Sequence, residues 1–359
     1  MTHPLPGAYS PTLQSLVAAS LLRSGTDTRA ALLFKALPRD TPDPVRALAT
    51  AIEPRADRRP ALVNAAMGQA ERALGQAGAC GAALLTLGQE GYPPRLAEIA
   101  DPPIVLWTTG DPGLLLGPAV ALVGSRRATT AGLATARSLG RDLARAGLTV
   151  VSGLARGIDA AAHQGALEVG GRTVAVLGCG VDVVYPREHR ELVAGVRSTG
   201  CLVSELAPGT PPLPRHFPLR NRLISGLSLA VVVVEAAQRS GSLITARMAL
   251  EQGRDVLAVP GAVVSGCHRG CHALIKDGAG LVETADDVLA AVGWPGAAPS
   301  RPGPGGGLVG AMRVGEPVSA DDLAAQVSRP PGQLLAELAE LELAGRVARM
   351  PGGLYVRLD

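Results

Sequence analysis

Two segments that combine glycine, serine and arginine each follow an apolar run of β-forming residues. The first is GSRRATT at 124–130 and the second is SGLARGID at 152–159. Glycine lets backbone N–H groups approach an anion, and the N-terminus of a following helix favours negative charge there. A single glycine between a strand and a helix is often only a tight turn. Two such turns, each with serine and arginine, indicate a phosphate cradle.

Two later segments could complete such a site. RHFPLRNR at 215–222 places Phe217 among cations, which suits stacking on an unpaired base. Packing of Phe217 in the core beside surface arginines explains the same pattern equally well. EAAQRSGSLIT at 235–245 again follows a predicted strand and opens a predicted helix. Its serines can bind an anion or simply cap the helix.

An alternation of strands and helices must position these segments. Apolar, β-rich runs occur at 104–107, 119–123, 148–151, 173–177, 202–204, 229–234 and 256–259. Helical stretches at 130–146, 158–169 and 243–252 separate several of them. This pattern predicts a parallel sheet covered on both faces, with ligands outside the carboxyl ends of the strands. We expect a Rossmann-like domain over residues 79–292.

The chain on the N-terminal side of this domain reads as a small all-α domain, residues 1–78, of the SAM or helix-hairpin kind. Apolar residues recur at helical spacing from Leu13 to Leu22, Asp27 could cap a second helix running to Leu37, and 61–77 is another helical run. Its residues carry no chemistry, so we interpret it as a packing or docking domain.

On the C-terminal side, residues 293–307 form a Pro/Gly linker and residues 308–359 a third unit. Helices at 308–313, 320–326 and 331–343, followed by a hairpin at 346–350 and 354–357, predict a winged helix. This unit holds 5 arginines against 7 acidic residues, and its expected recognition helix carries Glu337, Glu340 and Glu342. Acidic side chains oppose contact with phosphates, so a protein contact or a regulatory role is at least as well supported as duplex reading.

Composition limits where a nucleic acid could bind. The 359 residues are 47% hydrophobic and 18% charged, and the formal net charge is only +3. Any basic site must therefore be local.

The sequence shows no signal peptide and no stretch of about 20 apolar residues. Its five cysteines do not indicate a disulfide framework. These features predict a cytoplasmic protein without a membrane span.

Five motifs, in this order, give the chain a resemblance to a known family: VGSRRATTAG at 123–132, SGLARGIDAAAH at 152–163, FPLRNRLISGLS at 217–228, VVEAAQRSGSLITA at 233–246 and VPG at 259–261. Together they resemble the DNA-processing protein A (DprA/Smf) family, over residues 80 to 290. The resemblance implies an extended Rossmann fold that binds single-stranded DNA without catalysis, cofactor or metal. It also implies a homodimer formed through the central domain, and loading of RecA onto the strand in natural transformation and recombination. Single-strand-binding protein is a further candidate partner.

The predicted DNA-binding residues combine the family motifs with the local chemistry. Two departures from the family pattern stand out: Ala131 replaces a usual aromatic residue, and GCH at 270–272 replaces a usual Gly-Thr-Asn. The second change puts His272 where an amide could contact a base. The predicted set is Gly124, Ser125, Arg126, Arg127, Thr129, Ser152, Gly153, Arg156, Gly157, Arg215, His216, Phe217, Arg220, Asn221, Arg222, Arg239, Ser240, Gly241, Ser242 and His272.

An enzyme is the main alternative. Asp159, His163, Glu205 and Glu235 could supply acid–base chemistry, and the expected fold resembles that of the LOG phosphoribohydrolases, which act on nucleotides. Those enzymes carry PGGxGTxxE, whose glutamate is needed for catalysis, whereas the comparable turn at 239–245 lacks both the pattern and the glutamate.

Other motifs argue against further alternatives. There is no P-loop sequence for ATP hydrolysis, and GCG at 178–180 lacks the third glycine of a dinucleotide fingerprint. CHRGCH at 267–272 has the wrong spacing for haem attachment and lacks further zinc ligands at ordinary spacing. A third class, a scaffold that only dimerises and binds duplex DNA or a partner protein through its winged helix, is disfavoured by the clustered arginines.

Overall fold

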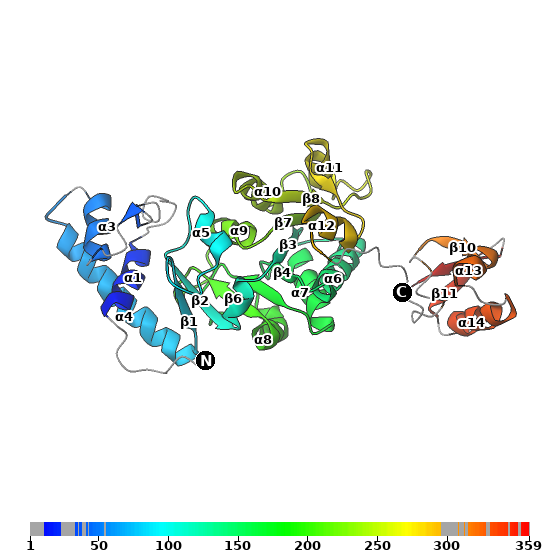
Figure 1. The fold of residues 1–359 in the computed structure, drawn as a ribbon, viewed down its shortest axis with the longest axis horizontal. Helices are drawn as coiled ribbons and strands as arrows, with labels where there is room; N and C mark the ends of the chain where they lie inside the picture. Colours follow the sequence, from blue (N-terminus) through cyan, green and yellow to red (C-terminus); the bar gives the residue numbers. More distant parts are fainter. Residues whose placement is uncertain are drawn as a thin grey trace. The chain divides into compact units, whose positions relative to one another are not determined.

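The structure is a computed structural model. It describes residues 11–22, 33–34, 36–37, 41, 43–53, 55–295, 308, 312, 315–327, 331–343, 345–350 and 353–358. The chain divides into two compact units, residues 1–296 and 297–359, whose elements are drawn in Figure 1. Within the described residues, no helix is both long enough and apolar enough to cross a membrane.

A nine-stranded sheet forms the centre of the first unit, in the order β1-β2-β6-β5-β4-β3-β7-β8-β9. The pairs β1–β2 and β2–β6 are antiparallel and all other neighbours are parallel. The strands are β1 (Ala83–Thr86), β2 (Val105–Gly110), β3 (Ala119–Gly124), β4 (Thr149–Ser152), β5 (Thr173–Val176), β6 (Cys201–Ser204), β7 (Ala230–Glu235), β8 (Asp255–Ala258) and β9 (Gly280–Leu281).

The central strands are buried because both faces of the sheet are covered. Every residue of β4, β5, β6 and β7 is buried, as expected for continuous apolar runs in a parallel sheet. Helix α6 packs against α7, and α9 against α10. The helices of this part are α5 (Pro94–Glu98), α6 (Thr130–Arg145), α7 (Ile158–Glu168), α8 (Arg190–Thr199), α9 (His216–Gly226), α10 (Ser242–Glu251), α11 (Arg269–Lys276) and α12 (Ala285–Ala291), with 3-10 turns η1 (Pro112–Leu115) and η2 (Arg187–His189).

The direction of chain progression reverses at β3. From β3 the chain adds β4, β5 and β6 on one side, and then returns to place β7, β8 and β9 on the other. The carboxyl ends of β3 and β7 are therefore neighbours at a topological switch point, which is where open α/β sheets bind ligands. This confirms the predicted Rossmann-like class, with β1 and β2 as antiparallel additions at one edge.

Three N-terminal helices belong to the same compact unit as the sheet. They are α1 (Pro11–Leu21), α3 (Pro44–Ile52) and α4 (Arg59–Cys80). Their apolar faces share one core cluster with Trp107 of β2 and with Val181. The predicted helices near 13–22 and 61–77 are confirmed as α1 and α4, whereas the helix expected between Asp27 and Leu37 lies largely outside the described residues.

The second unit has the predicted winged-helix elements. Its helices are α13 (Ala320–Val327) and α14 (Pro331–Leu343), and its sheet has the order β10-β12-β11. The hairpin of β11 (Val347–Met350) and β12 (Leu354–Arg357) is confirmed, and β10 (Pro317–Ser319) adds a third strand. The predicted first helix at 308–313 and the predicted linker at 293–307 lie largely outside the described residues.

Candidate nucleic-acid interface

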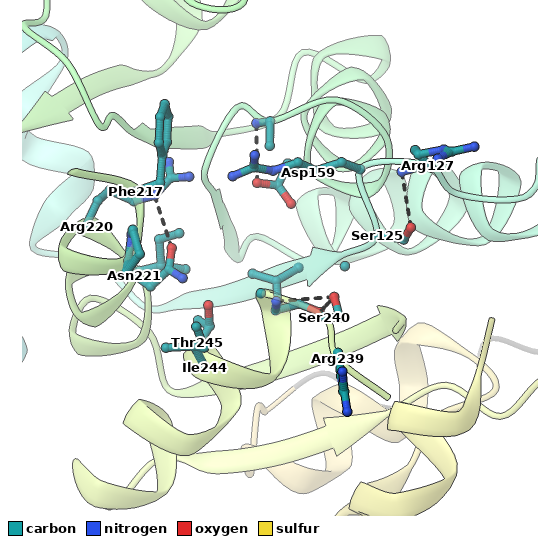
Figure 2. A pocket seen from close by; sticks show the side chains of 18 of the residues that line it. Ser125, Arg127, Asp159, Phe217, Arg220, Asn221, Arg239, Ser240, Ile244 and Thr245 are labelled. Carbon is teal, nitrogen blue, oxygen red and sulfur yellow. Dashed lines mark hydrogen bonds between the residues drawn. The ribbon is translucent and has the colours of Figure 1, made fainter. Parts of the chain in front are cut away.

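A pocket of ≈ 620 Å³ opens at the carboxyl ends of β3 and β7. Figure 2 shows side chains reaching it from the turn after β3, the start of α7, helix α9 and the turn after β7. Eleven of the predicted residues line this pocket, although they span more than a hundred positions of the sequence: Gly124, Ser125, Arg126, Arg127, Phe217, Arg220, Asn221, Arg239, Ser240, Gly241 and Ser242.

The turn after β3 presents two free cations. The Ser125 N–H donates to the Glu235 carbonyl oxygen at 2.8 Å, and the Arg127 N–H donates to the Ser125 hydroxyl at 3.1 Å. These bonds fix the backbone, while Arg126 and Arg127 stay exposed. Neither guanidinium pairs with a carboxylate of the described chain. Both are therefore available to an anionic ligand.

Five residues of helix α9 line the pocket, and four of them lie on one face of the helix. Phe217, Arg220, Asn221 and Ile224 all line the pocket, and their spacing of i, i+3, i+4 and i+7 places them on the same side of a helix. Phe217 is therefore part of the pocket wall and is only partly buried.

An aromatic pair borders the pocket beside one of the free arginines. The Phe217 and Tyr185 ring centroids lie 5.4 Å apart with the planes tilted by 39°. The Arg126 guanidinium carbon lies 5.4 Å from the Phe217 centroid, within cation–π range. Tyr185, which is 40% exposed, was not among the predicted residues. Tyr185 lies in the loop that follows β5 and is one of only four tyrosines in the chain. This rarity is the one sequence signal that could have indicated it.

A buried arginine and a buried carboxylate stand at the floor of the pocket. Arg220 donates to the carbonyl oxygens of Gly153, at 2.5 Å, and Val176. Burial lowers the pKa of Arg220 to about 10, against the attraction of Asp159, so the guanidinium stays charged at neutral pH. Asp159 accepts from the N–H groups of Gly153 and Ala155 at 3.2 and 3.3 Å. Burial raises the pKa of Asp159, and the charge of Arg220 opposes that rise.

Within the turn after β4, Ala155 lines the pocket, whereas the residues predicted to form a second phosphate cradle lie outside its lining: Ser152, Gly153, Arg156 and Gly157. The Ser152 hydroxyl is buried and donates to the Leu122 carbonyl oxygen at 2.6 Å. Gly157 has φ 76°, and a Cβ there would lie 2.2 Å from the Ser125 carbonyl oxygen. A Cβ at position 153 would lie 2.4 Å from the Arg220 guanidinium, so this position also requires glycine. Arg156 is exposed but pairs with Glu188 at 2.5 Å.

Arg222, which was predicted to hold a phosphate, is bound by two carboxylates of the chain instead. Its side chain is 9% exposed and binds Asp101 at 3.2 Å and Glu205 at 2.8 Å. Position 222 lies off the pocket face of α9, because neighbouring helix residues point about 100° apart. Four other predicted residues also lie outside the pocket lining: exposed Arg215, buried His216, Thr129, and His272, whose Nε2 lies 3.1 Å from the Gly261 carbonyl oxygen.

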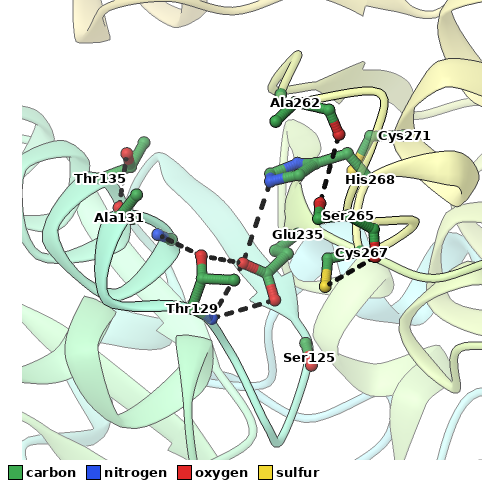
Figure 3. A network of polar contacts seen from close by, with 12 residues as sticks. Ser125, Thr129, Ala131, Thr135, Glu235, Ala262, Ser265, Cys267, His268 and Cys271 are labelled. Atoms are coloured by element: carbon green, nitrogen blue, oxygen red, sulfur yellow. Dashed lines mark hydrogen bonds and ion pairs between the residues drawn. The ribbon is translucent and has the colours of Figure 1, made fainter.

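The four candidate acid–base residues are dispersed. Asp159 lines the pocket, whereas His163 is buried in α7 against Thr173. Glu205 pairs with Arg222, and Glu235 is 1% exposed and binds Thr129 (Figure 3). Among the described residues, no group of His, Cys, Asp and Glu is arranged to hold a metal ion. This geometry offers no paired acid and base around the pocket.

Together, the fold and the pocket define an α/β protein of the extended Rossmann type with a basic, aromatic-lined pocket at its switch point and a C-terminal winged helix. The model of the family "DNA recombination-mediator protein A" matches residues 83–293, and that of the DprA winged helix domain matches residues 295–353. The chain belongs to this DprA/Smf family.

Individual relatives agree with this assignment. The chain is 43% identical over 289 residues to Protein Smf of Escherichia coli (strain K12), which covers 77% of both chains. It is 48% identical over 199 residues to DNA processing protein DprA of Streptococcus pneumoniae, covering 55% of this chain and 70% of the relative. The solved structure of S. pneumoniae DprA matches with a TM-score of 0.68 at 36% identity, over 79% of this chain and 98% of that one.

A second solved structure is that of another protein of this name. DNA processing protein A from Helicobacter pylori, reported for its single-stranded DNA binding mode, matches with a TM-score of 0.53 at 29% identity. The match covers 58% of this chain and 95% of that chain.

Proposed function

We propose that this chain binds single-stranded DNA in the pocket at the carboxyl ends of β3 and β7, without sequence preference and without a chemical reaction. The observation that carries this proposal is the grouping of three exposed arginines, Arg126, Arg127 and Arg239, with the rings of Tyr185 and Phe217 around one pocket. Phosphates need cations and unpaired bases need aromatic faces, and single-strand-binding surfaces combine the two.

The geometry favours the unpaired strand over a duplex. A base can lie against the Phe217 or Tyr185 ring only if it is unstacked from its neighbours, which costs little in a single strand. Contacts to phosphates and ring faces do not distinguish the four bases, so binding should tolerate any sequence. The H. pylori relative, known for its single-stranded DNA binding mode, supports the same ligand.

We further infer that the bound strand is protected and passed to RecA. This inference rests on membership of a family of recombination mediators. A homodimer with two aligned pockets would hold one strand at two places, and single-strand-binding protein is a candidate partner. The acidic winged helix, with Glu340 and Glu342 exposed on α14, fits a protein contact better than a phosphate contact.

Fluorescence anisotropy of labelled oligo-dT tests the central proposal. The full chain is titrated over a salt series, with unlabelled duplex of the same length as competitor. We expect preference for the single strand, and affinity that falls steeply as salt rises, because phosphate contacts release counterions. Equal binding of duplex, or affinity that does not change with salt, would overturn the proposal.

A RecA assay tests the finer inference separately. RecA assembly on a strand coated with single-strand-binding protein is followed with and without the chain. We expect faster assembly with the unaltered chain than with Arg126→Ala. If the two rates are equal while the unaltered chain still binds the strand, RecA loading is contradicted and the proposed strand binding is not.

A further inference from the structure

A second groove of ≈ 510 Å³ adjoins the pocket across the turn after β7. The pocket and the groove share Ala237 and Arg239, and the far wall of the groove is formed by Ser265, Cys267 and Arg269. We propose that this Arg239–Arg269 groove is a second subsite, which binds the sugar-phosphate backbone of the strand as it leaves the pocket. This proposal rests on the proposed function.

The charge of the groove points to phosphate. Arg239 and Arg269 are both exposed, and no carboxylate among the residues that the structure describes pairs with either guanidinium. Two unpaired cations facing one groove repel each other, and a phosphate between them would remove that repulsion. Because Arg239 also lines the pocket, a strand that fills the pocket can reach the groove without leaving basic surface.

Arg269 occupies a position that is unfavourable without an anion. It is the first residue of α11, and the N-cap His268 makes no side-chain capping bond. The N-terminus of a helix carries a partial positive charge, so a cation there is disfavoured. A phosphate beside Arg269 would be attracted by both the side chain and the helix terminus.

The backbone holds the two arginines in one groove. The Gly270 N–H donates to the Ala236 carbonyl oxygen at 2.8 Å, which joins the start of α11 to the turn after β7. A Cβ at position 270 would lie 2.8 Å from the carbonyl oxygens of both Ala236 and Ala237, so this approach requires glycine. The loop that precedes α11 contains Val263 and Val264, whose exposed fractions are 74% and 98%. These apolar side chains offer contact to a ribose or a base.

Cysteine footprinting provides a direct test. Cys267 lines the groove and is part-exposed, while Cys80, at the end of α4, is also part-exposed and serves as the internal control. Cys179, Cys201 and Cys271 are buried. We expect saturating oligo-dT to slow maleimide labelling of Cys267 severalfold and to leave labelling of Cys80 unchanged. Equal labelling of Cys267 with and without the bound strand would overturn the second subsite.

Substitution of Arg269 tests the phosphate contact itself. We expect Arg269→Ala to weaken oligo-dT binding about tenfold and to lower the slope of log affinity against log salt by roughly 0.7, the value for one phosphate of a single strand. Arg247→Ala is the matched control, because Arg247 is an exposed arginine of α10 that lines neither the pocket nor the groove. A slope for Arg269→Ala equal to that of Arg247→Ala would overturn the proposal.

These tests separate failure of the subsite from failure of the proposed function. If the unaltered chain does not bind oligo-dT, the proposed function fails. If the unaltered chain binds and Arg126→Ala weakens binding, while Arg269→Ala changes neither affinity nor slope, the pocket stands and the second subsite fails. Thermal unfolding of Arg269→Ala should occur at a temperature no lower than that of the unaltered chain, which shows that any lost binding does not come from unfolding.

Discussion

The Glu235 carboxylate accepts a hydrogen bond from the Thr129 hydroxyl at 2.6 Å and another from the Thr129 N–H at 3.0 Å. Thr129 caps α6 and follows the turn after β3, whereas Glu235 ends β7. This pair therefore ties together the two turns that line the pocket, as Figure 3 shows. His268 Nε2 lies 4.0 Å from the same carboxylate, so the start of α11 is close to the same anchor.

Replacing this buried carboxylate should loosen both turns. Glu235→Gln keeps the size of the side chain but leaves a single neutral acceptor for two donors. Hydrogen bonds to a charged group contribute about 1.5–3 kcal/mol, so we expect the free energy of unfolding to fall by that amount in urea denaturation. Glu251→Gln, at an exposed position of α10, is the control and should change little. Equal stability of the two variants would contradict the anchoring role.

Arg126 should dominate the affinity for the strand. Its guanidinium lies over the Phe217 ring and pairs with no carboxylate of the described residues. Loss of one charge-assisted phosphate contact should cost about 1.5–3 kcal/mol, which is about ten- to a hundredfold in the dissociation constant. Anisotropy with oligo-dT measures this for Arg126→Ala, with circular dichroism to show that the variant is folded. A folded variant with normal affinity would refute the assigned role of the turn after β3.

Arg222 should matter for stability and not for binding. Burial opposes its charge, but Glu205 and Asp101 hold the pKa of Arg222 above its usual value. Arg222→Met would leave both carboxylates without this cation, and breaking a buried ion pair typically costs about 3–5 kcal/mol. Denaturation in urea measures this loss. In the folded fraction, the salt slope for oligo-dT should equal that of the unaltered chain; a lower slope would show that Arg222 does contact phosphate.

The aromatic pair should contribute through stacking. Tyr185→Ala removes an exposed ring from beside the pocket, and base stacking on an aromatic side chain is worth about 1–3 kcal/mol by alanine substitution. We expect weaker binding of oligo-dT by Tyr185→Ala with an unchanged salt slope, since no cation is lost. Tyr185→Phe keeps the ring and should bind normally. If Tyr185→Phe is as weak as Tyr185→Ala, the hydroxyl rather than the ring makes the contact.

The central strands and the turns that follow them were predictable from local pattern. The runs at 119–123, 148–151 and 229–234 fall within about a residue of β3, β4 and β7, because strands buried on both faces leave continuous apolar sequence. Helix α3, which begins at Pro44, was not predicted. Proline is tolerated at the first position of a helix, and Asp43 caps this one.

The site was predictable only as far as the strand ends determine it. The turns after β3 and β7 meet because parallel strands place their carboxyl ends at one edge. The partners of Arg222 were not predictable, because Asp101 lies 121 positions away in the sequence and no local spacing indicates it. Tyr185 was missed for a similar reason: its loop reaches the pocket only through the fold.

Stability should depend on pH through His163, which is fully buried in α7. The Thr173 hydroxyl donates to the Val150 carbonyl oxygen, so it accepts from His163 Nδ1–H at 2.7 Å. Nε2 has no hydrogen-bond partner among the described residues, so a second proton there would be unsatisfied. Burial, reinforced by the charge of Arg220, lowers the pKa of His163 to about 3.

The sign of the effect follows from linkage. Below pH of about 6.5 the unfolded chain protonates this histidine while the folded chain does not, so stability falls as pH drops from about 6.5 towards 3. Across the middle of this window the group should contribute a slope of about 1.4 kcal/mol per pH unit. His163→Asn, which has an amide donor in place of Nδ1–H, should lose that slope in urea denaturation at pH 4 to 6. Gln164→Asn, exposed on the same helix, should retain it. A pH dependence for His163→Asn equal to that of Gln164→Asn would show that His163 is protonated alike in both states.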